Sequence, residues 1–341
     1  MSETTLTNRR IVLAAYPEGN AKAQDFRMHS DAAPTPADGE FLVGMRWISV
    51  DPMLRIRIDA APMGGTLAPL PLGTTIPGAA VGEVVVSHHP DFTVGSLVEG
   101  RFGWQDYAVS DGAGVHHVDP SLGSPEVALG PLGLPGFSAY VGLHAAGGVR
   151  PGQTVLVSGA AGAVGSMVGP LARAAGARVI GVANGEEKCR YLIDELGYHA
   201  AIDRSRGKLA ADLAVAAPDG VDLYFDNVGG DMLIEVMRQL KRGGQVLICG
   251  LMAQYNGVDT TGPDRYPALL ELIMNRTATV RAFANVHYEH LRPDFIRDVA
   301  PLVATGALPH RMHVRDGLEA APDALASLFG DGVTGKLVVR V

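Results

Sequence analysis

The sequence predicts an α/β fold in which a doubly wound parallel sheet is joined to a second, mainly antiparallel β domain. In the middle of the chain, short apolar strands alternate with helical stretches, which is typical of a parallel sheet with helices on both faces. The first third shows short strands broken by Gly and Pro, without long helices between them. A length of 341 residues exceeds one ordinary core, so about two domains are expected.

Composition and charge narrow the class of protein. Apolar residues make up 47% of the chain and charged residues 19%, as in globular proteins with a large core. The net charge of −8 with scattered basic residues argues against a nucleic-acid partner or an acidic membrane. Cys189 and Cys249 are far apart, which excludes a disulfide framework and a Cys-x-x-Cys metal site. Without a signal core at residues 1–10 or a membrane-spanning apolar run, we expect a soluble, cytoplasmic protein.

Residues 10–122 predict an antiparallel, partly closed β domain. The clearest strands are 41–50 and 79–86, and the clearest turns are 34–39 and 89–92. Turns rich in Pro, Gly and Asp are the usual boundaries of such short strands.

From about residue 129 the pattern changes to alternating strands and helices. A helix is expected over 134–142. The expected strands are 154–158, 178–183, 200–203, 223–226, 245–250 and 279–284, and the helices between them are 164–175, 186–196, 208–216, 231–240 and 266–276. Past about Ala304 the pattern returns to β and ends in a strand at 335–341. We expect this strand to rejoin the first domain, which gives domains of 1–127 with 305–341, and 128–304.

The run from Val155 to Gly165 is the most informative single feature. An apolar strand ends in small residues, in which Ala160, Gly162 and Gly165 occupy the positions of a G-x-G-x-x-G turn. Such a turn admits a pyrophosphate close to the backbone, and the following helix offers free N–H groups. The expected ligand is a dinucleotide on a Rossmann sheet, although a tight turn without a ligand has the same composition.

The end of the second Rossmann strand distinguishes NAD from NADP. An acidic residue there would accept the ribose 2′-hydroxyl, but the strand ends in Ala183-Asn184-Gly185. Lys188 and Arg204 follow and could pair with a 2′-phosphate. The alternative is that both are solvated surface charges. We expect a preference for NADPH.

Several motifs occur in order along nearly the whole chain. They are Asn8-Arg9-Arg10, Ser49-Val50-Asp51-Pro52, Gly100-Arg101-Phe102-Gly103-Trp104, residues 158–166, Phe225-Asp226-Asn227-Val228-Gly229-Gly230, and Cys249-Gly250 with Gln254-Tyr255-Asn256. Together they resemble the zinc-independent prostaglandin/leukotriene reductase family of the medium-chain dehydrogenase/reductase superfamily, which includes curcumin and alkenal double-bond reductases. The resemblance implies a discontinuous GroES-like β domain and a homodimer formed through the strand at 279–284.

The resemblance also implies residue roles. Lys188 matches the lysine that binds the 2′-phosphate, and Asn227 matches a cofactor-contacting Asn. Ser138 stands where a Thr approaches the nicotinamide, and Phe283 matches the strand whose backbone binds the carboxamide. The remaining residues expected at the cofactor are Ala161, Gly162, Ala163, Val164, Arg204, Cys249 and Tyr255.

The chain departs from the family pattern at three places. Arg204 and Met53 each replace a Tyr, and residues 331–336 lack the Asn that precedes Gly-Lys. Met53 and the loops at 62–77 and 257–265 are expected at the substrate entrance.

No zinc site is expected. Related zinc dehydrogenases have an early Cys, a Gly-His-Glu motif and a cluster of four Cys. In this chain Val50-Asp51-Pro52 stands at the place of the early Cys and Pro77-Gly78-Ala79 at that of Gly-His-Glu, and the only cysteines are Cys189 and Cys249. The paired histidines lack Cys partners, so we interpret them as surface or loop residues. They are His88-His89, His116-His117, His287 with His290, and His310 with His313.

Tyr255 follows the fifth Rossmann strand, and its phenol could donate a hydrogen bond to a developing enolate. The alternative is an ordinary packed loop tyrosine. The expected activity is NADPH-dependent reduction of the carbon–carbon double bond of α,β-unsaturated ketones or aldehydes. A zinc-free quinone reductase and a redox-inactive NADPH-binding protein are the other hypotheses, and turnover of enones, alkenals or quinones distinguishes them.

Overall fold

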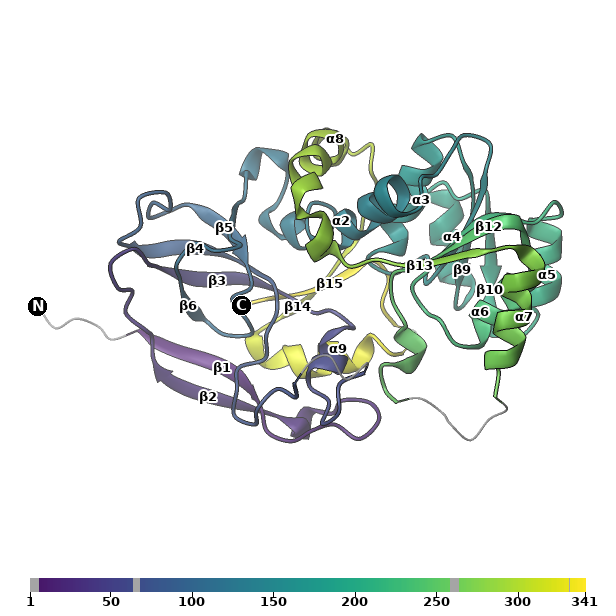
Figure 1. Cartoon of the computed structure of the whole chain (residues 1–341). Helices are drawn as coiled ribbons and strands as arrows, with labels where there is room; N and C mark the ends of the chain where they lie inside the picture. Colours follow the sequence, from purple (N-terminus) through teal and green to yellow (C-terminus); the bar gives the residue numbers. More distant parts are fainter. Residues whose placement is uncertain (1–5, 64–67, 258–263, 331) are drawn as a thin grey trace, which may run out of the picture. The chain divides into compact units, whose positions relative to one another are not determined.

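The computed structural model describes residues 6–63, 68–257, 264–330 and 332–341. The chain divides into two compact units (Figure 1). The first, called the β unit below, comprises Met1–Leu129 and Met312–Val341, and the second, the Rossmann unit, comprises Gly130–Arg311. No helix within the described ranges is long and apolar enough to cross a membrane.

The Rossmann unit contains a six-stranded parallel sheet in the order β10-β9-β8-β11-β12-β13. Its strands are β8 (Thr154–Ser158), β9 (Arg178–Ala183), β10 (Ala200–Asp203), β11 (Val221–Asp226), β12 (Leu240–Ile248) and β13 (Thr279–Ala282). This is the doubly wound order, and it confirms the predicted fold class. Every residue of β8 is buried, as a central strand covered on both faces requires.

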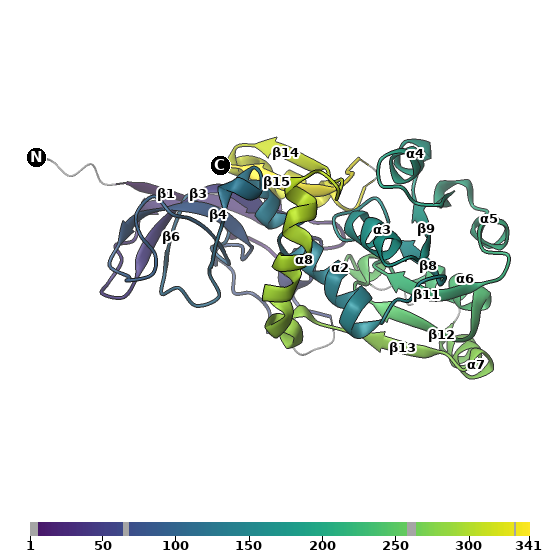
Figure 2. The same cartoon turned by 90° about the horizontal axis from the view of Figure 1, so that it is seen from above.

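Helices cover both faces of this sheet (Figures 1 and 2). Right-handed crossovers place α3 and α4 on one face and α5, α6 and α7 on the other. Their bounds are α3 (Gly165–Ala174), α4 (Glu186–Asp194), α5 (Leu209–Ala216), α6 (Asp231–Gln239) and α7 (Tyr266–Arg276). Two further helices, α2 (Leu134–Val141) and α8 (Arg292–Ala304), pack against each other beside the sheet. Helix α2 was expected from the sequence, whereas α8 was not.

The β unit is built on a seven-stranded sheet, which is antiparallel except for the pair β14–β15. Its strands are β3 (Phe41–Ser49), β4 (Ala80–Ser87), β5 (Leu97–Gly100), β6 (Tyr107–Ser110), β7 (His116–His117), β14 (Met312–Asp316) and β15 (Lys336–Arg340). A separate hairpin pairs β1 (Thr7–Leu13) with β2 (Phe26–Ala32). The largest buried side chains include Trp104, Phe41 and Ile48.

The C-terminal strand pairs antiparallel with β3, so the β unit is discontinuous. The second boundary lies at Arg311 rather than at residue 304. Leu308 is buried and its N–H donates to the Leu302 carbonyl, which keeps the segment after α8 in the Rossmann unit. The segment that we read as β also contains a helix, α9 (Ala321–Ser327). Its buried Ala321, Ala324 and Leu325 have helical spacing, which was the missed signal.

Candidate active site

The strand order of the Rossmann sheet reverses between β8 and β11, and ligands of such sheets bind beyond the carboxyl ends of the strands at this point. Ser158 ends β8 and Asp226 ends β11. The Ser158 hydroxyl donates to Oδ1 of Asp226 at 2.8 Å. Nδ2 of Asn227 donates to the Ser158 carbonyl at 2.7 Å. Asn227, a predicted cofactor residue, therefore joins the two strand ends.

Asp226 is a fully buried carboxylate that organises the turn after β11. Its Oδ1 also accepts from the Tyr224 hydroxyl at 2.8 Å and from the N–H groups of Val228 and Gly229 at 2.9 Å. Its Oδ2 is buried and has no hydrogen-bond partner among the described residues. A buried charge is costly unless hydrogen-bonded, so this carboxylate depends on the donors around Oδ1.

The turn between β8 and α3 has no room for larger side chains. Gly159 has a φ of +57°, and a Cβ on Gly165 would lie 2.4 Å from the Gly159 carbonyl oxygen. Within the described part of this unit, no carbonyl accepts from the N–H groups of Ala161, Ala163 and Val164. These donors, at the start of a helix, fit a pyrophosphate. Gly162 supports the turn through its N–H, which donates to the Gly159 carbonyl at 3.0 Å.

Lys188 and Arg204, the predicted 2′-phosphate residues, follow β9 and β10. Lys188 is half-buried in the first turn of α4, and Arg204 is exposed in the short helix after β10. In the turn before α4, the Gly185 N–H donates a hydrogen bond to Oδ1 of Asp203 at 2.8 Å. Hydrogen bonds from Ser205 and Gly185 lower the pKa of Asp203. This carboxylate was not identified from the sequence, because it belongs to β10 and reaches the end of β9 only through the pairing of Asp203 with Ala183.

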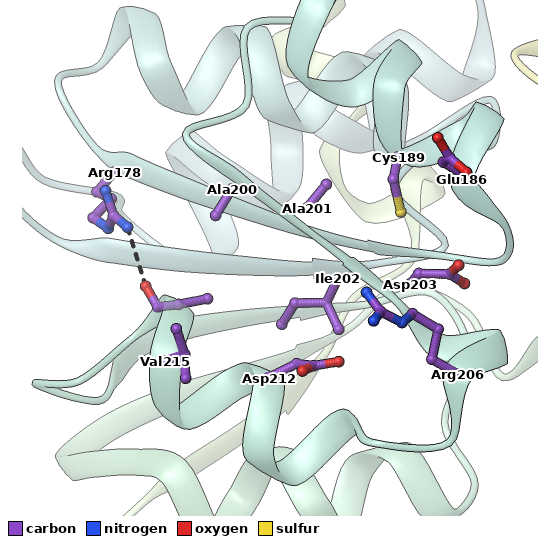
Figure 3. Close-up of a pocket in the computed structure, with 11 residues that line it drawn as sticks. Arg178, Glu186, Cys189, Ala200, Ala201, Ile202, Asp203, Arg206, Asp212 and Val215 are labelled. Atoms are coloured by element: carbon purple, nitrogen blue, oxygen red, sulfur yellow. Dashed lines mark hydrogen bonds between the residues drawn. The ribbon is translucent and has the colours of Figure 1, made fainter.

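A cavity of about 770 Å³ lies along β10 (Figure 3). Its lining includes Cys189 and Asp203, the chain neighbours of Lys188 and Arg204. Figure 3 shows Cys189, Asp203 and Arg206 at one end and Arg178 at the other. Burial raises the pKa of the Cys189 thiol, and the charge of Asp203 raises it further. Because the thiolate is the nucleophile, Cys189 is not activated for covalent chemistry. The edge strand β10 and residues of β9, α4 and α5 line this cavity, and the switch-point residues Ser158 and Asp226 do not.

Tyr255 follows a short helix, Met252–Gln254, beyond the end of β12. Its hydroxyl oxygen accepts from the Leu251 N–H at 3.1 Å. A Cβ on Gly250 would lie 3.2 Å from this oxygen, so the glycine leaves room for the hydroxyl. Burial raises the pKa of Tyr255, which keeps the phenol protonated. A phenol that accepts one hydrogen bond still has its own hydrogen to donate.

The loop that carries Tyr255 is connected to the switch point through Cys249. The Cys249 N–H donates to the Asp226 carbonyl at 2.8 Å. Burial raises the pKa of the Cys249 thiol to about 12, and the charge of Asp226 contributes. Cys249 therefore stays a neutral thiol, and its backbone holds the Tyr255 loop beside β11.

Ser138 and Phe283 come from neighbouring segments, since a Cβ on Gly142, just after α2, would lie 3.1 Å from the Phe283 ring. Ser138 is buried in α2, and its hydroxyl donates to the Leu134 carbonyl at 2.8 Å. The ring of Phe283, just after β13, meets the Phe225 ring edge to face at 6.1 Å between centroids. The Phe283 side chain therefore packs within the unit, which leaves its backbone as the part that could contact a cofactor.

The predicted substrate-entrance residues are only partly described. Met53 lies at the start of α1 (Leu54–Arg57) and is 44% exposed. Residues 64–67 and 258–263 of the two predicted entrance loops, and residue 331 of the altered C-terminal motif, lie outside the described residues. Among the described residues, no group of His, Cys, Asp and Glu side chains could hold a metal ion.

Two family models match the chain. The model described as "N-terminal domain of oxidoreductase" matches residues 9–118. The model described as "Zinc-binding dehydrogenase" matches residues 163–295, within the Rossmann unit.

Full-length relatives extend this match. The chain is 36% identical to the NADPH-dependent curcumin reductase of Escherichia coli, over 100% of this chain and 99% of the relative. It is 32% identical to the NADP(+)-dependent 2-alkenal reductase of Nicotiana tabacum, over 98% of both chains. The crystal structure of CurA from Vibrio vulnificus in complex with NADPH has a TM-score of 0.92 and 38% identity, over 98% of this chain and 99% of that one.

These matches run through both units, and they agree with the switch-point turn and with the order of the motifs along the chain. The chain therefore belongs to the zinc-independent double-bond reductase family of the medium-chain dehydrogenase/reductase superfamily.

Proposed function

We propose that this protein uses NADPH to reduce the carbon–carbon double bond of α,β-unsaturated ketones or aldehydes. The observation that carries the proposal is the protonated Tyr255 phenol, held by the Leu251 N–H beyond the carboxyl end of β12. Support also comes from the full-length similarity to a curcumin reductase and a 2-alkenal reductase.

The Rossmann unit offers donors for each part of the cofactor. The N–H groups of Ala161, Ala163 and Val164 would hold the pyrophosphate, and Lys188 with Arg204 would pair with the 2′-phosphate. The other residues that we propose at the cofactor are Ser138, Gly162, Asn227, Cys249, Tyr255 and Phe283. When bound, NADPH supplies the hydride that the β carbon of the substrate receives.

Tyr255 would stabilise the oxygen of the substrate as enolate charge develops. Its hydroxyl hydrogen is available because the oxygen accepts, rather than donates, the bond with Leu251. Hydrogen-bond donors arranged in advance around a developing oxyanion lower the barrier without reorganising during the reaction. Water or another donor completes the reduction by protonating the α carbon.

The test is NADPH oxidation with a panel of enones, alkenals and quinones, with mass spectrometry of the products. We expect saturated ketones or aldehydes with one double bond reduced. Turnover of quinones alone would move the protein to the quinone reductases, and cofactor binding without turnover would identify a redox-inactive binding protein. We expect turnover without zinc. Stoichiometric zinc, with loss of activity on chelation, would contradict this.

We also propose a homodimer formed through the edge of the Rossmann sheet. β13 is the terminal strand of that sheet and all of its residues are exposed. On the adjacent α7, Tyr266, Leu270 and Met274 are exposed apolar side chains. Exposed edges with apolar neighbours favour pairing with a second chain. Light scattering at micromolar concentration should give a dimer, and Val280→Lys should give a monomer. A wild-type monomer would contradict the proposal.

We propose a cytoplasmic location, supported by Cys189 and Cys249, which are free thiols. Disulfides persist mainly in oxidising compartments. Cell fractionation tests this location.

A further inference from the structure

Helix α8, in the segment after β13, packs against α2 through several side chains. The guanidinium of Arg292 lies over the Phe137 ring at 4.7 Å from its centroid. The Tyr140 hydroxyl donates to Oδ2 of Asp298 at 2.8 Å. Figures 1 and 2 both show α8 beside α2. These contacts fix the rotation of α2 about its axis, and therefore the direction of the Ser138 side chain.

Asn285 adds a direct bond to Ser138 from the same segment. Its Nδ2 donates to the Ser138 hydroxyl oxygen at 2.8 Å, across 147 residues of chain. Asn285 is half-buried at the start of the short helix Asn285–Leu291, two positions beyond Phe283. It thus connects the residue expected near the nicotinamide ring with the strand expected at its carboxamide.

The hydrogen bonds within the protein leave the Ser138 hydroxyl able to bind a ligand only as a hydrogen-bond acceptor. A hydroxyl has one hydrogen and two lone pairs. The hydrogen is donated to the Leu134 carbonyl, and one lone pair accepts from Asn285. If the amide oxygen of Asn285 faced Ser138 instead, that oxygen would take the hydrogen. In both orientations the hydrogen stays within the protein, and Ser138 can meet a ligand only as an acceptor.

We propose that Asn285 is a positioning residue that fixes Ser138 as the acceptor for the carboxamide N–H of the nicotinamide. This inference rests on the proposed NADPH-dependent function. Ser138 would therefore accept a hydrogen bond from the carboxamide N–H and would not donate one to the carboxamide oxygen. A cofactor that keeps the carbonyl but lacks the N–H should lose this hydrogen bond and no other bond to Ser138.

The experiment compares the equilibrium binding of NADPH with that of its reduced 3-acetylpyridine analogue, in which a methyl group replaces the amide NH₂. The measured quantity is the ratio of the two dissociation constants, analogue over NADPH. We expect Ser138→Ala to lower this ratio about fivefold, mainly by weakening NADPH, as the loss of one neutral hydrogen bond predicts. Asn285→Ala should lower it about threefold, because the hydroxyl loses its fixed direction.

Three further variants separate positioning from a general structural effect. Asn285→Asp should retain the ratio within about twofold, since its carboxylate can hold the Ser138 hydroxyl by accepting its hydrogen. The double variant of Asn285→Ala with Ser138→Ala should match Ser138→Ala alone. His287→Ala is the matched control on the same short helix and should leave the ratio unchanged, because His287 is exposed.

The inference is overturned if Ser138→Ala leaves the ratio unchanged, or if Asn285→Ala weakens both cofactors equally. Additive effects in the double variant would also overturn it. If Asn285→Ala does not fold, Asn285→Leu, which is close in volume, replaces it. Failure of the wild-type protein to bind NADPH, or to reduce any enone, would instead contradict the proposed function itself.

Discussion

Lys336 on β15 in the β unit and Asp226 on β11 in the Rossmann unit are both buried charged side chains, and the two have different surroundings. In the β unit the ammonium of Lys336, on β15, donates to the carbonyls of Val50 and Leu337 at 2.8 Å each. It also pairs with Oδ1 of Asp51 at 3.1 Å. In the Rossmann unit Asp226 accepts from side chains and N–H groups at the carboxyl edge of the sheet.

The separation in sequence between each charged residue and its hydrogen-bond partners indicates its structural role. The bond from Lys336 to Val50 spans 286 residues and joins the returning C-terminal strand to the residue that follows β3. Two of the four donors to Asp226 come from the turn that follows it, one from its own strand and one, Ser158, from the adjacent strand. Lys336 therefore closes a discontinuous fold, whereas Asp226 shapes the turn where the cofactor is proposed to bind. Changes at Lys336 should affect stability without affecting the cofactor, whereas changes at the Rossmann edge should affect binding or rate as well.

Lys336→Met should have the largest effect. Burial lowers the pKa of Lys336, and Asp51 partly offsets this. Removing the ammonium leaves the Asp51 carboxylate without its cation, which costs roughly 3–5 kcal/mol of unfolding free energy for a buried pair. Urea denaturation measures the loss. NADPH affinity of the folded variant should be unchanged within about twofold.

The control for this change is the double variant of Lys336→Met with Asp51→Asn. It should recover part of the lost stability, because the carboxylate left without a partner is also removed. If Lys336→Met instead weakened NADPH binding tenfold at full stability, the contrast between the units would be wrong.

Asp226→Ala should affect both stability and binding. It removes the acceptor of the buried Ser158 and Tyr224 hydroxyls, at about 3 kcal/mol. The turn at 227–229 also loses its acceptor, so NADPH affinity should fall about tenfold. Calorimetric titration measures binding. Tyr224→Phe is the control, since it removes one donor and should cost about 1 kcal/mol of stability with little change in affinity.

The Rossmann unit was predicted well because its signals are local. β8, β9, β10 and α7 have the expected bounds. For the inner strands β8 and β9 this follows because parallel strands buried on both faces are continuous apolar runs. In the β unit, α9 and the parallel pairing of β14 with β15 were not predicted. That pairing depends on residues that meet only after the chain returns.

The candidate site shows the same limit. The turn between β8 and α3 could be predicted from its glycine motif, because the backbone geometry of such a turn requires small residues at fixed positions. Asp203 reaches Gly185 across 18 residues, and Asn285 reaches Ser138 across 147. Neither pairing has a pattern in the sequence, since side-chain partners are set by the register and packing of whole elements. Asn285 and Asp226 were therefore not identified as site residues.

Lys188→Ala should weaken NADPH binding more than it changes stability. Loss of a charge-assisted hydrogen bond to the 2′-phosphate costs about 1–3 kcal/mol. NADH lacks this phosphate, so its affinity should stay within about twofold. Titration of both cofactors tests the prediction, and Arg190→Ala, exposed on the same helix, is the control. Equal affinities of the wild-type protein for NADPH and NADH would contradict it.

Tyr255→Phe should have the smallest effect on free energy and act almost entirely on rate. The change keeps the ring, so packing and cofactor affinity should be preserved. Losing a lone oxyanion donor costs about a hundredfold in rate, but a ribose hydroxyl or water can share the task. We therefore expect a loss of about tenfold, or about 1.4 kcal/mol.

The decisive measurement for Tyr255 is single-turnover reduction at saturating NADPH and enone, followed across pH. Burial raises the pKa of Tyr255 above its usual value, near 10 for a free phenol. The donating form is present below the folded pKa and is lost as pH rises through it. The wild-type rate should therefore stay flat between about pH 7 and 9 and fall only at higher pH, whereas the Phe variant should lack this fall. An unchanged rate in the Phe variant would make Tyr255 a packing residue, and the contrast between the units would then rest on binding alone.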